Sequence, residues 1–293
     1  MSNECVFFEE IDEDFEVEFD DFVEISDAGY ERGFEDGKIK GYEQGKTEGY
    51  ENGKADGYEE GQTTANALTA SIINRTVTSV PKEVLEGVTS IPSSFFNGCT
   101  NLVNIELTED ITQIGQSAFA NCTSLEHIEL SENVKILGSH VFSSAGLKTI
   151  TFNKNLEEIG LSAFYQMPNL IKLDFSPCVN LKHITNSICH TCYALEELIL
   201  PPNLETIKGG ILVNNSKVST LYFPSTVKSI DSSILTQAFG KPTLYIKATT
   251  PPTLTGKFTV AITKIVVPQG CADTYKSETN WSVYAGVIIE GDF

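Results

Sequence analysis

The residues most able to do chemistry form a short cluster beyond the middle of the chain. Cys189 and Cys192 are separated by two residues, His190 lies between them, and Cys178 and His183 precede them. Thiolates and imidazoles at such spacings can hold a structural zinc ion, and a Cys-x-x-Cys pair can also exchange a disulfide. Cys189 and Cys192 are therefore the candidate metal-binding or redox-active residues of this sequence.

The remaining titratable residues do not predict catalysis. The four histidines form no recognisable triad with a serine or a cysteine. The sequence also lacks a nucleophile elbow and the glycine loop that binds phosphate in nucleotide-dependent enzymes. Many carboxylates gather near the N-terminus, where no fixed acid–base pair can be argued. We expect neither enzymatic activity nor a cofactor.

The Cys-x-x-Cys pair lies inside a repeat that organises most of the chain. The repeat is clearest at residues 111–130, ITQIGQSAFANCTSLEHIEL, and its skeleton recurs at a spacing close to 23 residues over residues 88–267. In this register Cys189 takes the place of a phenylalanine, and Cys192 aligns with Cys122. Because the repeat alone generates the pair, we favour packing in a core over a zinc site or redox chemistry.

Apolar residues at fixed positions predict how each repeat folds. Ile128 and Leu130 are two residues apart, so on a strand they would point to the same face. Stacked repeats would pair such strands in parallel at about 4.8 Å and give one long sheet. Residues 111–114 predict a short apolar turn, which Gly115 would allow to continue. A large anchor residue would stack inside the core, and the anchors are Phe96, Phe119, Phe142, Phe164, Cys189, Leu212 and Leu235.

This unit resembles the BspA-like leucine-rich repeat, whose signature is Ile-Gly-x-x-Ala-Phe-x-x-Cys-x-x-Leu-x-x-Ile-x-Leu-Pro. The resemblance covers about residues 85–290 and is strongest at residues 111–130 and 156–175. It implies an α/β repeat solenoid, that is, a leucine-rich-repeat β-solenoid with stacked parallel short strands. Because Cys189 and later anchors depart from phenylalanine, we expect the aromatic column to weaken toward the C-terminus.

The ends of the array differ from its middle. We interpret residues 63–87 as a linker and N-terminal cap, residues 88–267 as the repeat array, and residues 268–293 as a C-terminal cap. In the last segment we expect a short helix over residues 272–276. Trp281 is expected to seal the open end of the core, because the outermost turn of a solenoid would otherwise expose apolar side chains.

A glycine at every fourth residue marks residues 29–62. A period of four is close to one helical turn, but each glycine inside a helix costs roughly 1 kcal/mol relative to alanine. Close packing between helices could offset that cost, so we expect a helical stalk that joins copies of the chain; a flexible spacer is the alternative. The glycines expected to lie at this contact are Gly33, Gly37, Gly41, Gly45, Gly49 and Gly53.

Residues 1–28 form an acidic head. Residues 1–62 carry 21 acidic and 5 basic side chains, a net charge of −16, whereas residues 63–293 carry 19 and 15, a net charge of −4. An acidic arm repels nucleic acid and anionic lipid, so we expect neither as a partner. Phe15, Val17 and Phe19 alternate with acidic residues, which predicts a strand that docks on a partner; a disordered arm is the alternative.

Recognition of another molecule is the function that the resemblance implies. We expect a non-enzymatic adhesion protein that binds a protein or glycan ligand on a cell surface, and that forms homo-oligomers through residues 29–62. The sequence shows neither an export signal nor a stretch of about 20 apolar residues for membrane insertion. An adhesion protein without such a signal fits a bacteriophage or prophage virion, attached to a virion or scaffold protein through residues 1–28. A bacterial surface adhesin or an intracellular protein-binding scaffold is the alternative.

Overall fold

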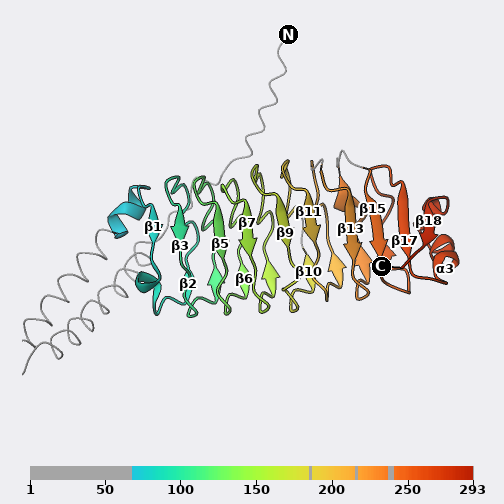
Figure 1. Ribbon diagram of the computed structural model, residues 1–293, viewed down its shortest axis with the longest axis horizontal. Helices are drawn as coiled ribbons and strands as arrows, with labels where there is room; N and C mark the ends of the chain where they lie inside the picture. The colour runs from blue at the N-terminus through green and yellow to red at the C-terminus, as the bar shows by residue number, and fades with distance from the viewer. Residues whose placement is uncertain (1–67, 185–186, 215–216, 237–240, 293) are drawn as a thin grey trace, which may run out of the picture.

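Short strands that alternate with tight turns wind the chain into an elongated solenoid (Figure 1). The computed structural model describes residues 68–184, 187–214, 217–236 and 241–292. Each repeat supplies one turn of the solenoid, and the turns stack along its long axis. The predicted repeat solenoid with stacked parallel short strands is therefore confirmed. The acidic head at residues 1–28 and the glycine-periodic stalk at residues 29–62 lie outside the described residues, so both stay predictions.

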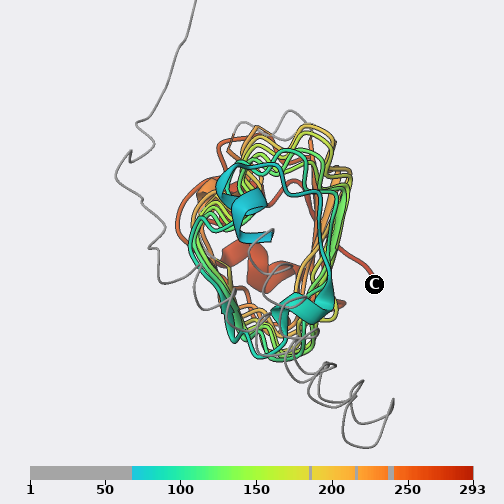
Figure 2. The ribbon, with the colours of Figure 1, turned by 90° about the vertical axis from the view of Figure 1, so that its left-hand side faces the viewer.

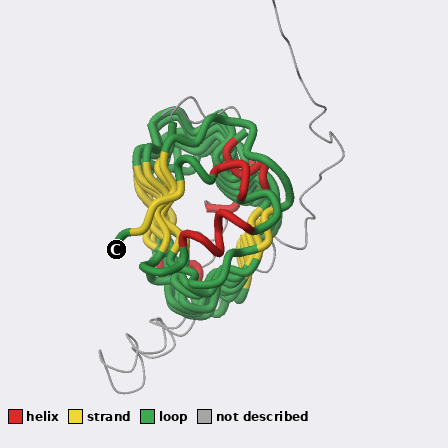
Figure 3. Tube along the Cα trace, turned by 90° about the vertical axis from the view of Figure 1, so that its right-hand side faces the viewer, coloured by secondary structure: helices red, strands yellow, loops and turns green. Residues whose placement is uncertain are grey.

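Two rows of strands run along opposite sides of the solenoid (Figure 3). Within both rows every strand pair is parallel, but the pairs form separate sheets of two or four strands, so the expectation of one long sheet is wrong. The first row, called here the long-strand face, consists of β1 (Ser79–Val80), β3 (Asn104–Ile105), β5 (His127–Glu129), β7 (Thr149–Thr151), β9 (Lys172–Asp174), β11 (Glu197–Ile199), β13 (Thr220–Phe223), β15 (Thr243–Ile246), β17 (Lys264–Val267) and β18 (Ile288–Glu290). The second row, called here the short-strand face, consists of β2 (Ser90–Ile91), β4 (Gln113–Ile114), β6 (Ile136–Leu137), β8 (Glu158–Ile159), β10 (His183–Ile184), β12 (Thr206–Ile207), β14 (Ser229–Ile230) and β16 (Thr253–Leu254).

The register of the long-strand face follows the repeat. Ile128 pairs with Ile150, and Leu221 pairs with Leu244, as the spacing of the repeats predicts. These residues are buried, whereas neighbours such as Glu129 are exposed, because successive side chains on a strand point to opposite faces. The repeat register therefore fixes both the strand pairing and the direction of each side chain.

The short-strand face corrects one expectation. Residues 111–114 and their equivalents were expected to form a turn, but their last two residues form strands that pair from turn to turn. Ile114, for example, pairs with Ile91 before it and with Leu137 after it. Strands of two residues are too short to show an alternating pattern, so the sequence did not distinguish them from a turn.

A column of aromatic rings fills the N-terminal part of the core. The rings of Phe96, Phe119, Phe142 and Phe164 stack with centroid distances of 5.3, 5.7 and 5.9 Å. From Cys189 onward the anchor residues are smaller, and all of them are buried. The ring of Phe175 packs against Phe164 at a centroid distance of 6.1 Å. The expected weakening of the aromatic column toward the C-terminus is confirmed.

Small elements close the two ends of the core. At the N-terminal end, residues 68–73 are helical and Ile72 is buried, and η1 (Lys82–Leu85) follows β1 (Figure 2). Between the two ends, inside the array, a 3-10 turn, η2 (Ser232–Leu235), follows β14. At the C-terminal end α3 (Ala272–Ser277) and η3 (Ser282–Tyr284) lead into β18. Trp281 is fully buried there, and its Nε1 donates a hydrogen bond to the Pro252 carbonyl oxygen at 2.7 Å.

The helices that the structure describes do not have the length and apolar character that a membrane span needs. Within residues 68–292, apart from the short gaps, every helix is too short or too polar to cross a bilayer.

Candidate functional site

Cys189 and Cys192 lie inside the core. Both side chains have no exposed surface, and the Cys192 Sγ donates a hydrogen bond to the Phe164 carbonyl oxygen at 2.9 Å. In an earlier turn of the array, the Cys122 Sγ donates the equivalent hydrogen bond to the Phe96 carbonyl oxygen at 3.1 Å. Burial raises the pKa of Cys192 to about 12, so its thiol stays protonated at neutral pH.

The other members of the cysteine cluster do not join this pair in a metal site. Cys178 is buried, whereas His183 is exposed on β10 and its Nδ1 lies 2.7 Å from the Thr206 hydroxyl. Within the described ranges, no three His, Cys, Asp or Glu side chains are placed to hold a metal ion. Zinc binding and disulfide exchange both need a thiolate, which burial disfavours for Cys189 and Cys192. The arrangement suits packing.

Because the repeated residues point inward, a binding site must use the outward positions. On the long-strand face Tyr222 pairs with Tyr245, Tyr245 with Val266, and Val266 with Ile289, so these four residues lie side by side along the face, and Val266 is the buried member. We call these four residues the apolar row. The rings of Tyr222 and Tyr245 stack at a centroid distance of 4.6 Å. Tyr222 is 50% exposed and Ile289 is 45% exposed.

Charged pairs occupy the part of the long-strand face that lies closer to the N-terminus. Lys148 lies 2.7 Å from Glu126. Lys172 lies 3.2 Å from both Asp174 and Glu197, and hydrogen bonds to these carboxylates raise the pKa of the Lys172 amine. Exposed ion pairs contribute little to stability, but they give this part of the face a polar and specific pattern. The ion pairs of the long-strand face therefore lie closer to the N-terminus than the stacked Tyr222 and Tyr245 rings do.

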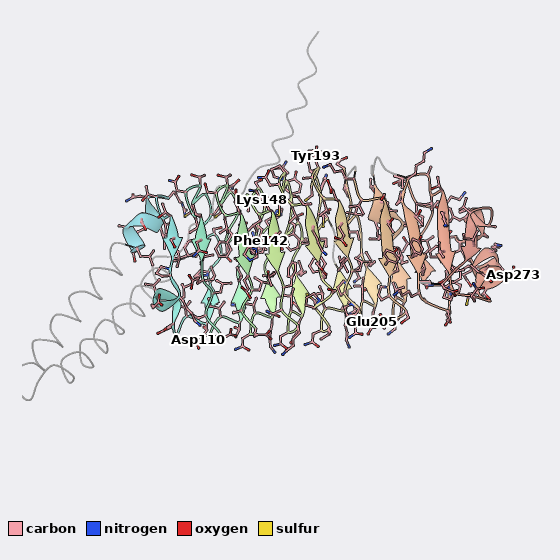
Figure 4. The ribbon with its side chains drawn as sticks, in the orientation of Figure 1. Asp110, Phe142, Lys148, Tyr193, Glu205 and Asp273 are labelled. Carbon is pink, nitrogen blue, oxygen red and sulfur yellow. The ribbon has the colours of Figure 1, made fainter. Side chains whose placement is uncertain are left out.

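The turns at the two edges of the solenoid differ in charge. One edge links short strands to the long strands that follow them, and in the turns that begin at β2, β4, β6, β8 and β10 it consists of residues 92–101, 115–124, 138–147, 160–169 and 187–194. These segments contain no Asp, Glu, Lys or Arg, and we call them the neutral edge. The equivalent segments after β12, β14 and β16 contain Lys208, Lys217, Asp231 and Lys257. Figure 4 shows Tyr193, which belongs to the neutral edge, opposite Asp110 and Glu205, which belong to the other edge, where a long strand leads to the next short strand.

Neutral side chains on the neutral edge contact each other from turn to turn. Asn121 donates a hydrogen bond to Asn97 at 3.1 Å, and Ser144 donates one to Gln166 at 3.4 Å. The rings of Tyr165 and His190 meet edge to face at a centroid distance of 5.2 Å. Burial lowers the pKa of the His190 imidazole, which keeps this residue uncharged at neutral pH.

The backbone explains the serine and the asparagine at the left-handed positions of the neutral edge. Ser117 and Asn121 adopt left-handed conformations with φ of 53° and 59°, which serine and asparagine tolerate better than branched residues do. Their N–H groups donate hydrogen bonds to Ser139 and Ser143 of the next turn at 2.9 and 2.8 Å. The sequence interpretation overlooked this edge. The signal that could have found it is a run of uncharged residues that recurs with the repeat.

The repeats of this chain are similar to those of known proteins. A family model described as "BspA type Leucine rich repeat region" matches residues 78–178 and 123–239, in six copies. The chain is 28% identical to a leucine-rich repeat protein of T. pallidum, over 46% of this chain and 69% of that chain, with a TM-score of 0.38. It is 22% identical to a leucine-rich repeat protein of Bacteroides ovatus, over 66% of this chain and 56% of that chain, with a TM-score of 0.45. It is 21% identical to the pneumococcal vaccine antigen PcpA, over 73% and 67% of the two chains, with a TM-score of 0.37. A comparison with curated proteins gave no match.

Proposed function

The chain belongs to the BspA-type leucine-rich repeat family, and we propose that it is a non-enzymatic recognition protein that binds a ligand on a cell surface. The repeated residues build the core, so the outward residues are free to vary without loss of the fold. A rigid solenoid presents such residues as an extended surface, which suits the binding of a large partner.

The apolar row is the observation that carries this proposal. Its adjacent Tyr222 and Tyr245 rings are exposed and half-buried, whereas Val266 is buried, and neighbouring exposed apolar side chains mark interaction sites more often than scattered ones do. Tyrosine is enriched among the residues that dominate binding energy, and the stacked Tyr222 and Tyr245 rings are already ordered before a partner arrives. The ion pairs around Lys172 would form the polar rim of the same surface. This combination fits a protein ligand.

Binding of the labelled full chain to intact bacterial and animal cells, measured by flow cytometry, tests the proposal. We expect saturable binding to at least one cell type, with an affinity that Tyr222→Ala lowers at least about tenfold. Val179→Ala is the matched control, because Val179 is 42% exposed but lies outside the apolar row. Equal affinities for the two variants would remove the apolar row from the proposal, and absence of binding to every cell type would contradict the function.

The N-terminal segments supply attachment in this proposal. Residues 1–28 would dock on a virion or scaffold protein, and residues 29–62 would join copies of the chain. The acidic head and the period of four glycines support these roles. A full chain that sediments as a monomer at high concentration would contradict the second role, and its absence from purified virions of the source would contradict the first.

A further inference from the structure

The absence of charge on the neutral edge is not a consequence of the backbone. Buried side chains such as Phe119 and Cys122 account for part of the absence, and the ion pairs among the described residues lie outside this edge. Left-handed positions such as Asn121 admit aspartate as readily as asparagine. The exposed positions Gln116, Asn121 and Gln166 could also hold lysine or glutamate without loss of packing. Neither burial nor the backbone therefore explains the missing charge at these exposed positions.

The neutral edge offers hydrogen-bonding groups that both donate and accept. The amides of Asn121 and Gln166 and the hydroxyl of Ser144 have this property, whereas a lysine only donates and a carboxylate only accepts. A sugar hydroxyl also donates and accepts, so it is matched by such groups. Phosphate and carboxylate groups need cationic partners, which the neutral edge lacks. The chemistry of the edge selects an uncharged, hydroxyl-rich ligand.

Aromatic rings lie within the same edge. Tyr165 lies between the rings of His140 and His190, at centroid distances of 6.3 and 5.2 Å. Tyr193 follows in the next turn and is 54% exposed. An aromatic ring is apolar on its face and polar at its hydroxyl, so Tyr193 can cover the apolar C–H face of a sugar ring. The aromatic rings therefore match the apolar C–H face of a pyranose, and the neutral amides match its hydroxyl groups.

The repeat spacing favours a polymer over a single sugar. Neighbouring turns of a parallel sheet are about 4.8 Å apart, which is close to the length of one pyranose unit. A polysaccharide repeats its hydroxyl groups along its length, as the neutral edge repeats its side chains. Hydrogen bonds between turns, such as Gln166 N–H to the His190 carbonyl oxygen at 2.9 Å, fix the positions of these side chains before binding.

We propose that the neutral edge binds an uncharged polysaccharide, which lies along the axis of the solenoid. This inference rests on the proposed recognition function, but it assigns a second face and a second class of ligand. The apolar row would bind protein, and the neutral edge would hold the glycan that surrounds that protein.

Affinity electrophoresis of the full chain tests the inference. The probes are soluble neutral polysaccharides (mixed-linkage β-glucan, galactomannan, dextran and starch) and two anionic ones (polygalacturonate and heparin). We expect retardation by at least one neutral polysaccharide, unchanged in about 1 M NaCl, because no charge contributes to binding. Gln166→Glu and Asn121→Asp keep the size of the side chain and add a charge, so each should weaken binding roughly tenfold.

Val179→Ala is the control, since Val179 is 42% exposed and lies outside both the neutral edge and the apolar row, so this change should leave retardation unchanged. Retardation by none of the neutral polysaccharides, or by the anionic ones alone, would overturn the inference. Retardation that both charge variants leave intact would also overturn the inference. The same holds if the neutral edge binds a protein ligand and the charge variants abolish that binding. Loss of cell binding in Tyr222→Ala without any polysaccharide binding would support the proposed function and reject the neutral edge as a glycan site.

Discussion

The buried cysteines of this solenoid have thiol pKa values that differ from those of cysteines in water. Burial raises the pKa of Cys178 and of Cys192 from the ordinary 9.0 to about 12. The pKa of Cys189, which is fully buried, also rises. A thiol inside the core keeps its proton because the thiolate would lose its hydration. These residues therefore act as small apolar side chains, in agreement with the packing explanation of the Cys-x-x-Cys pair.

Alkaline pH should destabilise the protein through these thiols. The unfolded thiols lose protons above pH 9.0, whereas folded Cys178 and Cys192 keep theirs to about pH 12. The folded state then binds more protons, so the free energy of unfolding falls as pH rises through this window. Each thiol contributes about 1.4 kcal/mol per pH unit.

Guanidinium unfolding curves at about pH 8 and about pH 10.5 measure this effect. We expect the wild-type chain to lose more stability between the two pH values than the Cys178→Ala/Cys192→Ala variant, which has two fewer groups to titrate. The variant corrects for lysines and tyrosines, which titrate in both proteins. Equal losses in both proteins would show that these thiols are not shielded.

Close contact between successive turns decides which residues the elements tolerate. Gly115, Gly138 and Gly160 each follow a strand of the short-strand face, and none of them has a positive φ. A Cβ atom on Gly138 would lie 2.5 Å from the Gln116 nitrogen and from the Gly115 carbonyl carbon. The glycines therefore allow the backbones of neighbouring turns to approach, rather than a left-handed turn.

Gly138→Ala should strain the stack. The added methyl group meets backbone atoms, which cannot move aside without separating two turns, so we expect a loss of about 1–3 kcal/mol in the free energy of unfolding. Gly286→Ala is the control, because nothing lies within 4 Å of its added Cβ and its φ is not positive. Denaturant unfolding followed by circular dichroism compares the two. If the Gly138 variant unfolds at the wild-type midpoint, the turns are not in rigid contact there.

The sequence predicted the long strands better than the short ones. Ile128 and Leu130 have the two-residue spacing of a strand with one buried side, and the repeat then predicted that Ile128 pairs with Ile150. The strand Gln113–Ile114 has only one inward residue, so its spacing carries no comparable signal. The neutral edge escaped notice for a different reason. Its residues are far apart in sequence, and only the stacking of the turns brings Tyr165 next to His190.

At the scale of the whole molecule, the solenoid has a continuous core and two ends. Each turn packs mainly on its neighbours, so the stability of the array resembles a sum of turns and contacts between turns. The repeat predicted this architecture, because its ladders require stacking. It did not predict which surface binds a ligand, because outward residues such as Tyr222 and Gln166 do not contribute to the ladders. The ends are exceptions, where one turn lacks a neighbour and other elements must cover it.

The C-terminal end offers a direct test of this one-dimensional behaviour. The chain has a single tryptophan, Trp281, which is fully buried against Tyr275 at a ring centroid distance of 5.5 Å. The Tyr275 hydroxyl donates a hydrogen bond to the buried Ala248 carbonyl oxygen at 2.7 Å. Tyr275→Phe removes this bond and leaves the carbonyl oxygen without that donor, which costs about 1–3 kcal/mol.

Because contacts are local, this loss should act on the last turns first. Tryptophan fluorescence reports only the C-terminal end, whereas far-ultraviolet circular dichroism reports the whole array. We expect the fluorescence midpoint of Tyr275→Phe to fall below its circular dichroism midpoint, and Tyr193→Phe, a change at an exposed tyrosine, to leave both at the wild-type values. Two midpoints that fall together in Tyr275→Phe would mean that the array unfolds as one cooperative unit, in which the end is no weaker than the middle.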